Sequence, residues 1–452
     1  MAGNADRLTA LTVTEAAQAI RNGAVSSEAL TEAHLARISA RNGEVRAFAH
    51  IDADYAREQA KAADRARGTG NGIGPLHGVP IAVKDIIDTR DYPTEYGCPA
   101  HTGNRPTRDA TCVAALRSAG AIILGKTVTT ELALLTPSVA CNPLNTAHSP
   151  GGSSAGSATA VADEMVPAAL GTQTAGSVLR PASYCGIYGY KPTFGLIPRS
   201  GVLMQSHTLD TLGLFARSIE DLALLTDCMA RFDPADAASY HTSGPNIASI
   251  AAGKPPLPPS FAFVKTPAWS SNADPAMQEA FDELVSELGS QCDEIEIPGL
   301  DRVLEWQRLV QLAENAAYYG PLQDRSRDLL SQGLNTRLDE GAKVPVRAYV
   351  EAVASRDRAY EKVAELFSHY SVILTPAAPG PAPRLDEGIT GSPIFNGLWT
   401  YLGMPAVSVP VLEVNGLPVG VQLVGPRRDD GRLLRTARWL VQHLAGQPAS
   451  TS

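Results

Sequence analysis

Two short stretches rich in Ser, Gly and Thr carry side chains suited to covalent catalysis. The first is SPGGSSAGSAT, residues 149–159, and the second is LGTQTAGSVLRPASYCG, residues 170–186. Ser177 in the second stretch follows Ser153 in the first by 24 residues. A third stretch, GVPIAV, predicts a short buried strand, and Lys84 stands at its end. A serine nucleophile, a proton-relaying serine and a lysine base would form an acyl-transfer site without histidine.

The first stretch has two other interpretations. Its composition is also typical of a flexible linker, although both flanks belong to one α/β unit. Residues 152–156 also match the GxSxG motif, which would make Ser154 the nucleophile of an esterase. That motif requires an apolar strand directly before the nucleophile, whereas VACNPLNTAHSP contains two prolines and several polar residues. We therefore disfavour the esterase, and spacing alone leaves open whether Lys84, Ser153 and Ser177 meet.

Residues 120–127, GAIILGKT, match the phosphate-binding pattern GxxxxGK[ST]. Such a site is a flexible loop between a strand and a helix, with its N–H groups turned toward the phosphates. Here the variable positions are Ala, Ile, Ile and Leu, and the local order is helix, turn, strand. The pattern therefore predicts a strand and not a nucleotide site.

The elements around these residues alternate between strands and helices. The first 70 residues and residues 300–367 have the patterns of helices, and Asp274 is placed to cap another helix. Three strand-like segments and a helix over 431–444 close the chain. This alternation predicts an α/β fold with a mixed sheet.

Composition bounds the partners. The chain has 452 residues, 44% of them hydrophobic, and a net charge of −9 without a Lys/Arg cluster, which argues against a nucleic-acid surface. No uncharged apolar run reaches the length of a membrane span, and no segment is typical of a signal peptide. The six cysteines form no CxxC pair, and no HExxH motif occurs. We expect a cytoplasmic protein with reduced thiols, no metal, no cofactor, and no nucleic-acid or membrane partner.

Four segments together closely resemble the amidase signature family of serine hydrolases: GVPIAVKD, SPGGSSAGSAT, GTQTAGSVLRPASYCGIYGYKPT and TLDTLGLFARSIEDLALL. A later segment, IFNGLWTYLGMPAVSVPV followed by GLPVGVQLVG, is similar to that family's C-terminal hallmark. The resemblance covers residues 10–232 and 345–445 and is weakest over 233–344. It implies a single large, twisted, mixed β-sheet flanked by helices on both faces.

The resemblance also implies one amidase domain over residues 1–452. Its expected parts are N-terminal helices (1–70), a signature core with the catalytic residues (71–232), a variable substrate-shaping segment (233–344) and the C-terminal part of the core (345–447).

The resemblance implies catalytic roles for three residues. Ser177 falls on the family's nucleophile, Ser153 on a bridging serine whose peptide bond is cis, and Lys84 on the general base. A lysine with an ordinary pKa near 10.4 is neutral in only about one molecule in 2,500 at pH 7. Desolvation can lower a lysine pKa by about 3–5 units, so we expect Lys84 to be buried behind the apolar strand.

The second stretch also supplies backbone donors. Its TQTAGS segment can turn several consecutive N–H groups inward, which is the usual way to hold an oxyanion. Matched to the family, these are the N–H groups of Thr174, Ala175, Gly176 and Ser177.

Two positions depart from the family pattern. Gln173 and Ala175 stand where many members carry Asp and Gly, and the glutamine is similar to a branch that includes malonamidases and biuret hydrolases. We expect Ser154 to support its loop by hydrogen bonding. Arg180 is expected to fix the second loop through a salt bridge, with substrate binding as the alternative role.

The implied activity is hydrolysis of the C–N bond of small-molecule amides, including aryl amides and carbamates (urethanes), through a serine acyl-enzyme. The alternative within the family is an amidotransferase A-type subunit, which needs partner subunits; otherwise we expect a monomer or homodimer. Six aromatic residues are candidates for the pocket, although each is individually more typical of a core: Trp306, Tyr318, Tyr319, Phe395, Trp399 and Tyr401.

Overall fold

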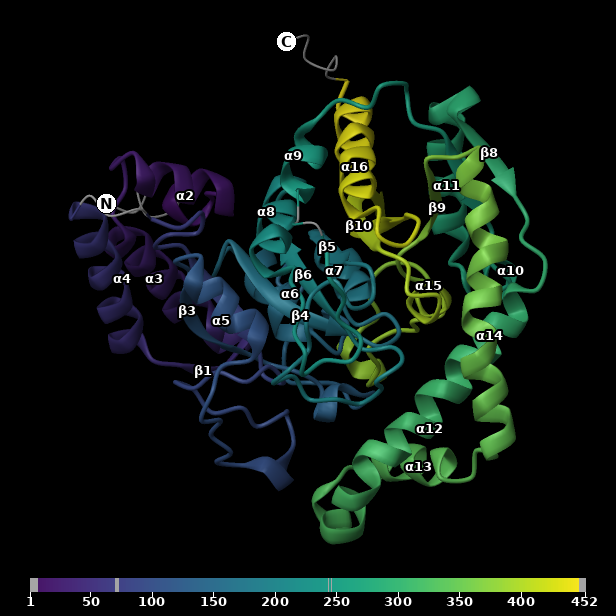
Figure 1. Ribbon diagram of the computed structural model, residues 1–452, viewed down its shortest axis with the longest axis horizontal. Coiled ribbons are helices and arrows are strands. Elements are labelled where there is room, and N and C mark those ends of the chain that lie inside the picture. The colour runs from purple at the N-terminus through teal and green to yellow at the C-terminus, as the bar shows by residue number, and fades with distance from the viewer. Residues whose placement is uncertain (1–6, 70–72, 243, 245, 447–452) are drawn as a thin grey trace.

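The computed structural model describes residues 7–69, 73–242, 244 and 246–446, and within them eleven strands form one mixed sheet (Figure 1). The strand order across the sheet is β1-β3-β2-β4-β6-β5-β10-β11-β9-β7-β8. The strands are β1 (Phe48–Ile51), β2 (Pro80–Lys84), β3 (Ile122–Thr127), β4 (Ala168–Gln173), β5 (Tyr188–Lys191), β6 (Thr211–Ala216), β7 (Phe261–Val264), β8 (Cys292–Ile295), β9 (Val372–Pro376), β10 (Ala406–Val414) and β11 (Leu417–Val424).

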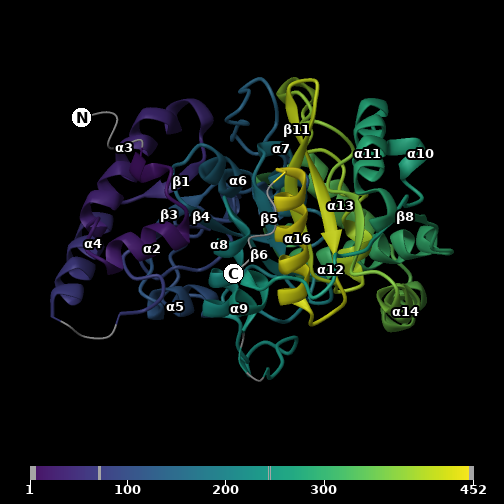
Figure 2. The same ribbon diagram turned by 90° about the horizontal axis from the view of Figure 1, so that it is seen from above.

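The helices surround this sheet (Figure 2). They are α2 (Val13–Arg21), α3 (Ser27–Val45), α4 (Ala53–Gly68), α5 (Thr111–Ser118), α6 (Ala155–Ala162), α7 (Leu179–Cys185), α8 (Ile219–Met229), α9 (Ile247–Ala252), α10 (Trp269–Asn272), α11 (Pro275–Leu288), α12 (Leu300–Ser326), α13 (Gln332–Gly341), α14 (Val346–Ala364), α15 (Gly397–Tyr401) and α16 (Asp430–Leu444).

Both faces of the sheet are covered by helices, which explains why β2 is apolar on both sides. Ile81 and Val83 of β2 belong to a core that includes residues of α2, α5, α8, α9, α11 and α16. Ala82, between them, belongs to a second core built with α3, α4, α6 and α7. The single mixed sheet with helices on both faces is confirmed.

The sheet is parallel around the lysine strand and again at its β9-β7-β8 edge, and it is antiparallel between these two regions. β2 pairs in parallel with β3 on one side and with β4 on the other. Beyond β4, the pairs β4·β6, β6·β5, β5·β10, β10·β11 and β11·β9 are antiparallel. Because the carboxyl ends of neighbouring parallel strands lie at the same edge, the end of β2 is brought close to the end of β4.

Most element predictions are confirmed, and one is corrected. Asp274 caps α11, and the final helix covers Asp430–Leu444. The GAIILGKT motif forms strand β3, as its apolar residues predict. The first 70 residues are not purely helical, because Phe48–Ile51 pairs antiparallel with β3 as strand β1. This strand is only four residues long, too short for its period-2 pattern to stand out between two helices.

Residues 300–364 form a helical arm at one side of the molecule, to the right in Figure 1. Helices α13 and α14 both pack on α12, and α12 in turn contacts α15. The arm lies largely within the segment expected to vary among family members and to shape the substrate pocket.

Other expectations concern partners and cysteines. None of the described helices combines the length and apolar character that a membrane span requires. In the part of the chain that the structure describes, no group of three or more His, Cys, Asp and Glu side chains is arranged to hold a metal ion. All six cysteines are free, and all but Cys228 are buried. The outer ends of the expected domain, residues 1–6 and 447–452, lie outside the described residues.

Candidate active site

Lys84 is the last residue of β2, and its side chain is fully buried. Its Nζ lies 2.7 Å from Ser153 Oγ and 2.9 Å from Thr172 Oγ1. Burial lowers the pKa of Lys84 well below its ordinary value, and the negative charge of Asp210 opposes this shift. The shift favours the neutral amine, which is the form that a general base requires.

Ser153 is held from both sides by hydrogen bonds to its backbone. The peptide bond between Gly152 and Ser153 is cis, as the resemblance implies. The Gly152 carbonyl oxygen, which belongs to this peptide bond, accepts a hydrogen bond from Arg180 Nη2 at 2.6 Å. The Ser153 carbonyl accepts one from the Thr130 amide at 3.2 Å. The carbonyl groups of Gly152 and Ser153 are thus both held by hydrogen bonds, and the Ser153 hydroxyl contacts Lys84 Nζ.

Ser177 lies in the turn between β4 and α7, next to the first loop. The Ser154 amide donates to the Ser177 carbonyl at 3.4 Å, so the two Ser/Gly-rich stretches are in direct contact. The Ser177 side chain is half-buried and lines a cavity. Among the described residues, no acceptor is bonded to the N–H groups of Ala175, Gly176 and Ser177. These amides therefore remain available to an oxyanion.

Ser154 has a different environment from Ser153. It is fully buried, and its hydroxyl donates to the Thr172 carbonyl at 3.2 Å and accepts from the Thr172 amide at 3.3 Å. It directly precedes helix α6, and no strand comes before it, because residues 135–154 are irregular. Ser154 thus bonds to the backbone near the end of β4, and its surroundings do not form a nucleophile elbow.

Gln173, at the end of β4, joins three segments. Its Oε1 accepts hydrogen bonds from the amides of Val178 (2.9 Å) and Leu179 (3.0 Å), at the start of α7. Its Nε2 donates to Thr400 Oγ1 at 3.0 Å, and that hydroxyl donates to the Ala175 carbonyl at 2.7 Å. A glutamine has both an acceptor and a donor for this bridge, whereas an aspartate lacks the donor.

The salt bridge expected for Arg180 is not formed. No carboxylate of the described residues lies within ion-pair distance of its guanidinium, which instead donates to the Gly152 carbonyl and, at 3.4 Å, to Thr390 Oγ1. Its Nε and Nη1 are buried without a hydrogen-bond partner in the described part of the chain, and burial lowers its pKa to about 10. The arginine therefore positions the cis peptide through a backbone carbonyl.

Two residues of the site were missed in the sequence. Thr172 contacts Lys84, and Asp210 accepts a hydrogen bond from Thr174 Oγ1 at 2.6 Å. Asp210 also accepts from the amides of Gln205 (2.8 Å) and Ser206 (2.9 Å), while burial raises its pKa to about 6. In the sequence, Thr172 is marked only by its place two positions before Thr174. Asp210 is marked only as the aspartate of TLDTLG.

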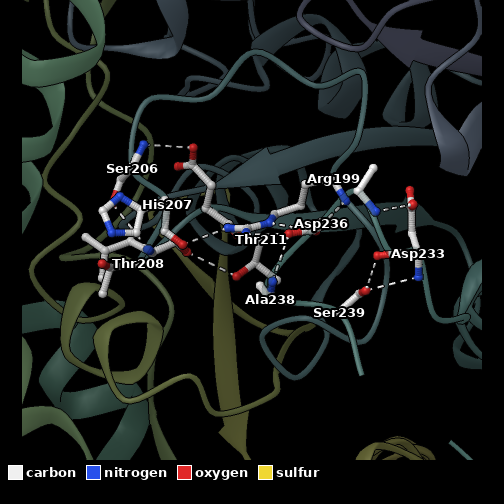
Figure 3. Close-up of polar contacts among 12 residues, drawn as sticks. Arg199, Ser206, His207, Thr208, Thr211, Asp233, Asp236, Ala238 and Ser239 are labelled. Atoms are coloured by element: carbon white, nitrogen blue, oxygen red, sulfur yellow. Dashed lines mark hydrogen bonds and ion pairs between the residues drawn. The ribbon is translucent and has the colours of Figure 1, made fainter. Parts of the chain in front are cut away.

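Arg199 holds the loop that carries Asp210 (Figure 3). Its guanidinium donates to the carbonyls of His207 (2.9 Å) and Asp210 (3.0 Å) and forms a buried ion pair with Asp236 at 2.8 Å. The two loop carbonyls therefore bond to the Arg199 guanidinium, and Asp236 neutralises the charge of that guanidinium. These contacts fix the loop and, with it, the position of the Asp210 carboxylate.

The cavity beside Ser177 has a volume of about 470 Å³. It lies between the catalytic loops and the helical arm. Its lining residues are Ala133, Leu134, Leu135, Ala175, Gly176, Ser177, Arg180, Leu304, Glu305, Gln307, Arg308, Gln311, Arg337, Ser392, Pro393, Ile394 and Gly397. None of the six candidate aromatic residues is among them, and Phe395, Trp399 and Tyr401 are fully buried in the core.

Comparison with known proteins agrees with this geometry. A family model described as Amidase matches residues 29–434. The chain therefore belongs to the amidase family, of the amidase signature type, and its class is that of amide-hydrolysing enzymes.

Individual relatives span nearly the whole chain. The A-type subunit of glutamyl-tRNA(Gln) amidotransferase from Chloroflexus aurantiacus is 32% identical over 468 residues, covering 94% of this chain and 95% of that protein. The native peptide amidase of Stenotrophomonas maltophilia is 28% identical, with a TM-score of 0.82 over 97% of this chain and 98% of that one. A 6-aminohexanoate cyclic dimer hydrolase bound to its substrate is 25% identical, with a TM-score of 0.86 over 98% and 99% of the two chains.

Proposed function

We propose that this amidase hydrolyses small-molecule amides through an acyl-enzyme on Ser177, with Ser153 as proton relay and Lys84 as base. One observation carries the proposal. The fully buried Lys84 amine contacts two hydroxyl groups, one of them Ser153, and has no carboxylate partner among the described residues. A buried amine in this environment favours its neutral form.

Acylation follows from this arrangement. The lone pair of neutral Lys84 accepts a proton from the Ser153 hydroxyl, while an amine N–H donates to Thr172 Oγ1. Ser153 in turn accepts the proton of Ser177, whose oxygen forms a bond to the carbonyl carbon. The tetrahedral intermediate collapses as its C–N bond breaks. Ser153 delivers a proton to the departing nitrogen and takes one back from the Lys84 ammonium, which returns to its neutral form. The amine leaves, and the acyl group remains on Ser177 as an ester.

Deacylation runs through the same groups. Water gives a proton to the relay and attacks the ester carbonyl, which releases the carboxylic acid and restores the Ser177 hydroxyl. In both steps the oxyanion accepts hydrogen bonds from the N–H groups of Thr174, Ala175, Gly176 and Ser177. Two hydrogen bonds hold this segment in place: the Thr174 hydroxyl donates to Asp210, and the Thr400 hydroxyl donates to the Ala175 carbonyl.

The substrates that we propose are small aliphatic and aryl amides, and carbamates that transfer their carbonyl group to Ser177 by the same steps. The size of the cavity, about 470 Å³, and its apolar residues Leu134, Leu135, Leu304 and Ile394 support small substrates with an apolar part. We propose that the enzyme acts in the cytoplasm as a monomer or homodimer.

The second candidate function is that of one component of an amidotransferase. The 32% identity to the A-type subunit of glutamyl-tRNA(Gln) amidotransferase favours it. Such a component would release ammonia from glutamine and would depend on partner subunits for the transfer. Glutaminase activity without turnover of other amides would favour this function over the first.

The test measures amine release from a panel of amides, esters and carbamates. Ser177→Ala is expected to lower kcat by about 10⁴-fold or more, and Ser153→Ala by a comparable factor, because each interrupts the same chain of groups. Ser154→Ala is the matched control. It removes the neighbouring hydroxyl, which contacts only the Thr172 backbone, and turnover should persist. Full turnover by Ser177→Ala would contradict the assignment of the nucleophile.

A further inference from the structure

The cavity beside Ser177 has a second, positively charged wall. Arg308 of α12 and Arg337 of α13 both line it, opposite the catalytic loops. Both belong to the helical arm, outside the segments that carry the family motifs. Leu304 and Ile394 line the same cavity and supply its apolar surface.

Arg337 is held in place by a buried neighbour. Its Nε donates to Asn315 Oδ1 at 3.1 Å, and Asn315, which is fully buried, donates through Nδ2 to the Gln205 carbonyl at 3.0 Å. One edge of the guanidinium is thereby fixed. Its other N–H groups form no hydrogen bond or ion pair with any residue that the structure describes.

The charges around these arginines are not balanced by nearby carboxylates. Over the described ranges, neither Arg308 nor Arg337 has a carboxylate within ion-pair distance. Glu305, the one acidic residue of the described cavity wall, is paired with Arg302 at 3.0 Å. Burial and the like charge of Arg308 lower the pKa of Arg337, and the charge of Glu340 opposes them.

Arg337 is half-buried and Arg308, beside it, is exposed, so an anion bound at Arg337 would relieve the repulsion between the two cations. The planar fork of an arginine matches a carboxylate through two parallel hydrogen bonds. The lining of the cavity therefore combines two arginines suited to a carboxylate, the Ser177 hydroxyl and an apolar surface.

We propose that the preferred substrates are amides that carry a carboxylate, separated from the scissile amide by an apolar chain. Arg337 and Arg308 bind the carboxylate, and Leu304 and Ile394 contact the chain. This inference rests on the proposed function, because Ser177 must attack the amide at the other end. Substrates of this class are monoamides of dicarboxylic acids, and neutral amides of the same length should be poorer substrates.

The kinetic test compares adipic acid monoamide with hexanamide, which has the same chain length but no charge. For the wild type, kcat/KM should be about 10- to 100-fold higher for the acid, the effect of charge-assisted hydrogen bonds to one carboxylate. Arg337→Gln should remove most of this preference by raising KM for the acid, so that the ratio of the two kcat/KM values falls toward one. Arg308→Gln should act in the same direction, and Arg337→Lys should restore part of the preference.

A binding measurement separates failure of this inference from failure of the proposed function. Calorimetry on Ser177→Ala, which cannot turn over, should show adipic acid monoamide binding more tightly than hexanamide, and Arg337→Gln in that background should abolish the difference. Equal binding of the two compounds would overturn the carboxylate site even if both were hydrolysed. Preferential binding without hydrolysis by the wild type would retain the site and contradict the proposed function.

Discussion

Two buried lysines on adjacent strands have opposite surroundings. In the parallel pair of β2 and β3, Lys84 lies opposite Thr127 and its neighbour Val83 lies opposite Lys126. Both lysine side chains are fully buried. Lys126 forms an ion pair with Asp85 at 3.1 Å and donates to Thr94 Oγ1 at 2.5 Å. Lys84 contacts only the hydroxyls of Ser153 and Thr172 among the described residues.

The difference shows that the partner, and not burial alone, decides what a buried lysine can do. Burial lowers the pKa of both amines, but at Lys126 an adjacent carboxylate opposes that effect and favours the charged form. At Lys84 the only opposing charge within the described chain is Asp210, which is not in contact with the amine. One lysine is therefore a structural cation and the other is suited to be a base.

The contrast is most directly tested at Lys84. Lys84→Met should lower kcat/KM by about 10²- to 10⁴-fold, the usual contribution of a general base. The free energy of unfolding should stay the same or rise, because the change removes a buried amine that has no charged partner. Amine release and urea denaturation on the same preparation measure the two quantities. Substantial turnover by this variant would assign the base to another group.

Lys126→Met should have the reverse profile. It leaves the Asp85 carboxylate buried without its cation, so we expect a loss of about 3–5 kcal/mol in the free energy of unfolding. Turnover of the folded protein should remain within a few-fold of the wild type, because Lys126 does not contact the serines. The double variant Lys126→Met/Asp85→Asn serves as control and should recover part of the stability. Loss of turnover with unchanged stability would remove the distinction between the two lysines.

The sequence already distinguished these lysines, but only in part. Lys126 belongs to GAIILGKT, and its apolar residues predicted the strand that the structure contains. Lys84, Ser153 and Ser177 could be selected as candidates because they lie in long motifs. Thr172, Asp210 and Arg337 escaped detection because their roles depend on contacts between distant segments, such as Thr174 with Asp210. The prediction of a salt bridge for Arg180 was wrong for the same reason. The partner of Arg180 is the Gly152 backbone carbonyl, and the residue types in the sequence do not indicate a backbone contact.

The smallest expected effect concerns the long-range charge on Lys84. The amine must lose its proton to act, so kcat/KM should rise with pH through the lowered pKa of Lys84. The ionised Asp210 raises that pKa, so Asp210→Asn should move the rising limb of the profile to lower pH. The shift requires an ionised carboxylate in the wild type, and the pKa of Asp210 is about 6. The two profiles should therefore differ most above that pH, where the Asp210 carboxylate is ionised.

Asp85→Asn is the matched control for this measurement. It removes a carboxylate that belongs to the surroundings of Lys126, and Asp85 makes no contribution to the pKa of Lys84. The rising limb of the pH profile of kcat/KM should therefore stay in place, even though the free energy of unfolding falls. An equal displacement by both variants would mean that the two lysines share one electrostatic environment. A displacement by Asp210→Asn alone would show that the pKa of Lys84 depends on the charge of Asp210, the residue that also binds the Thr174 side chain.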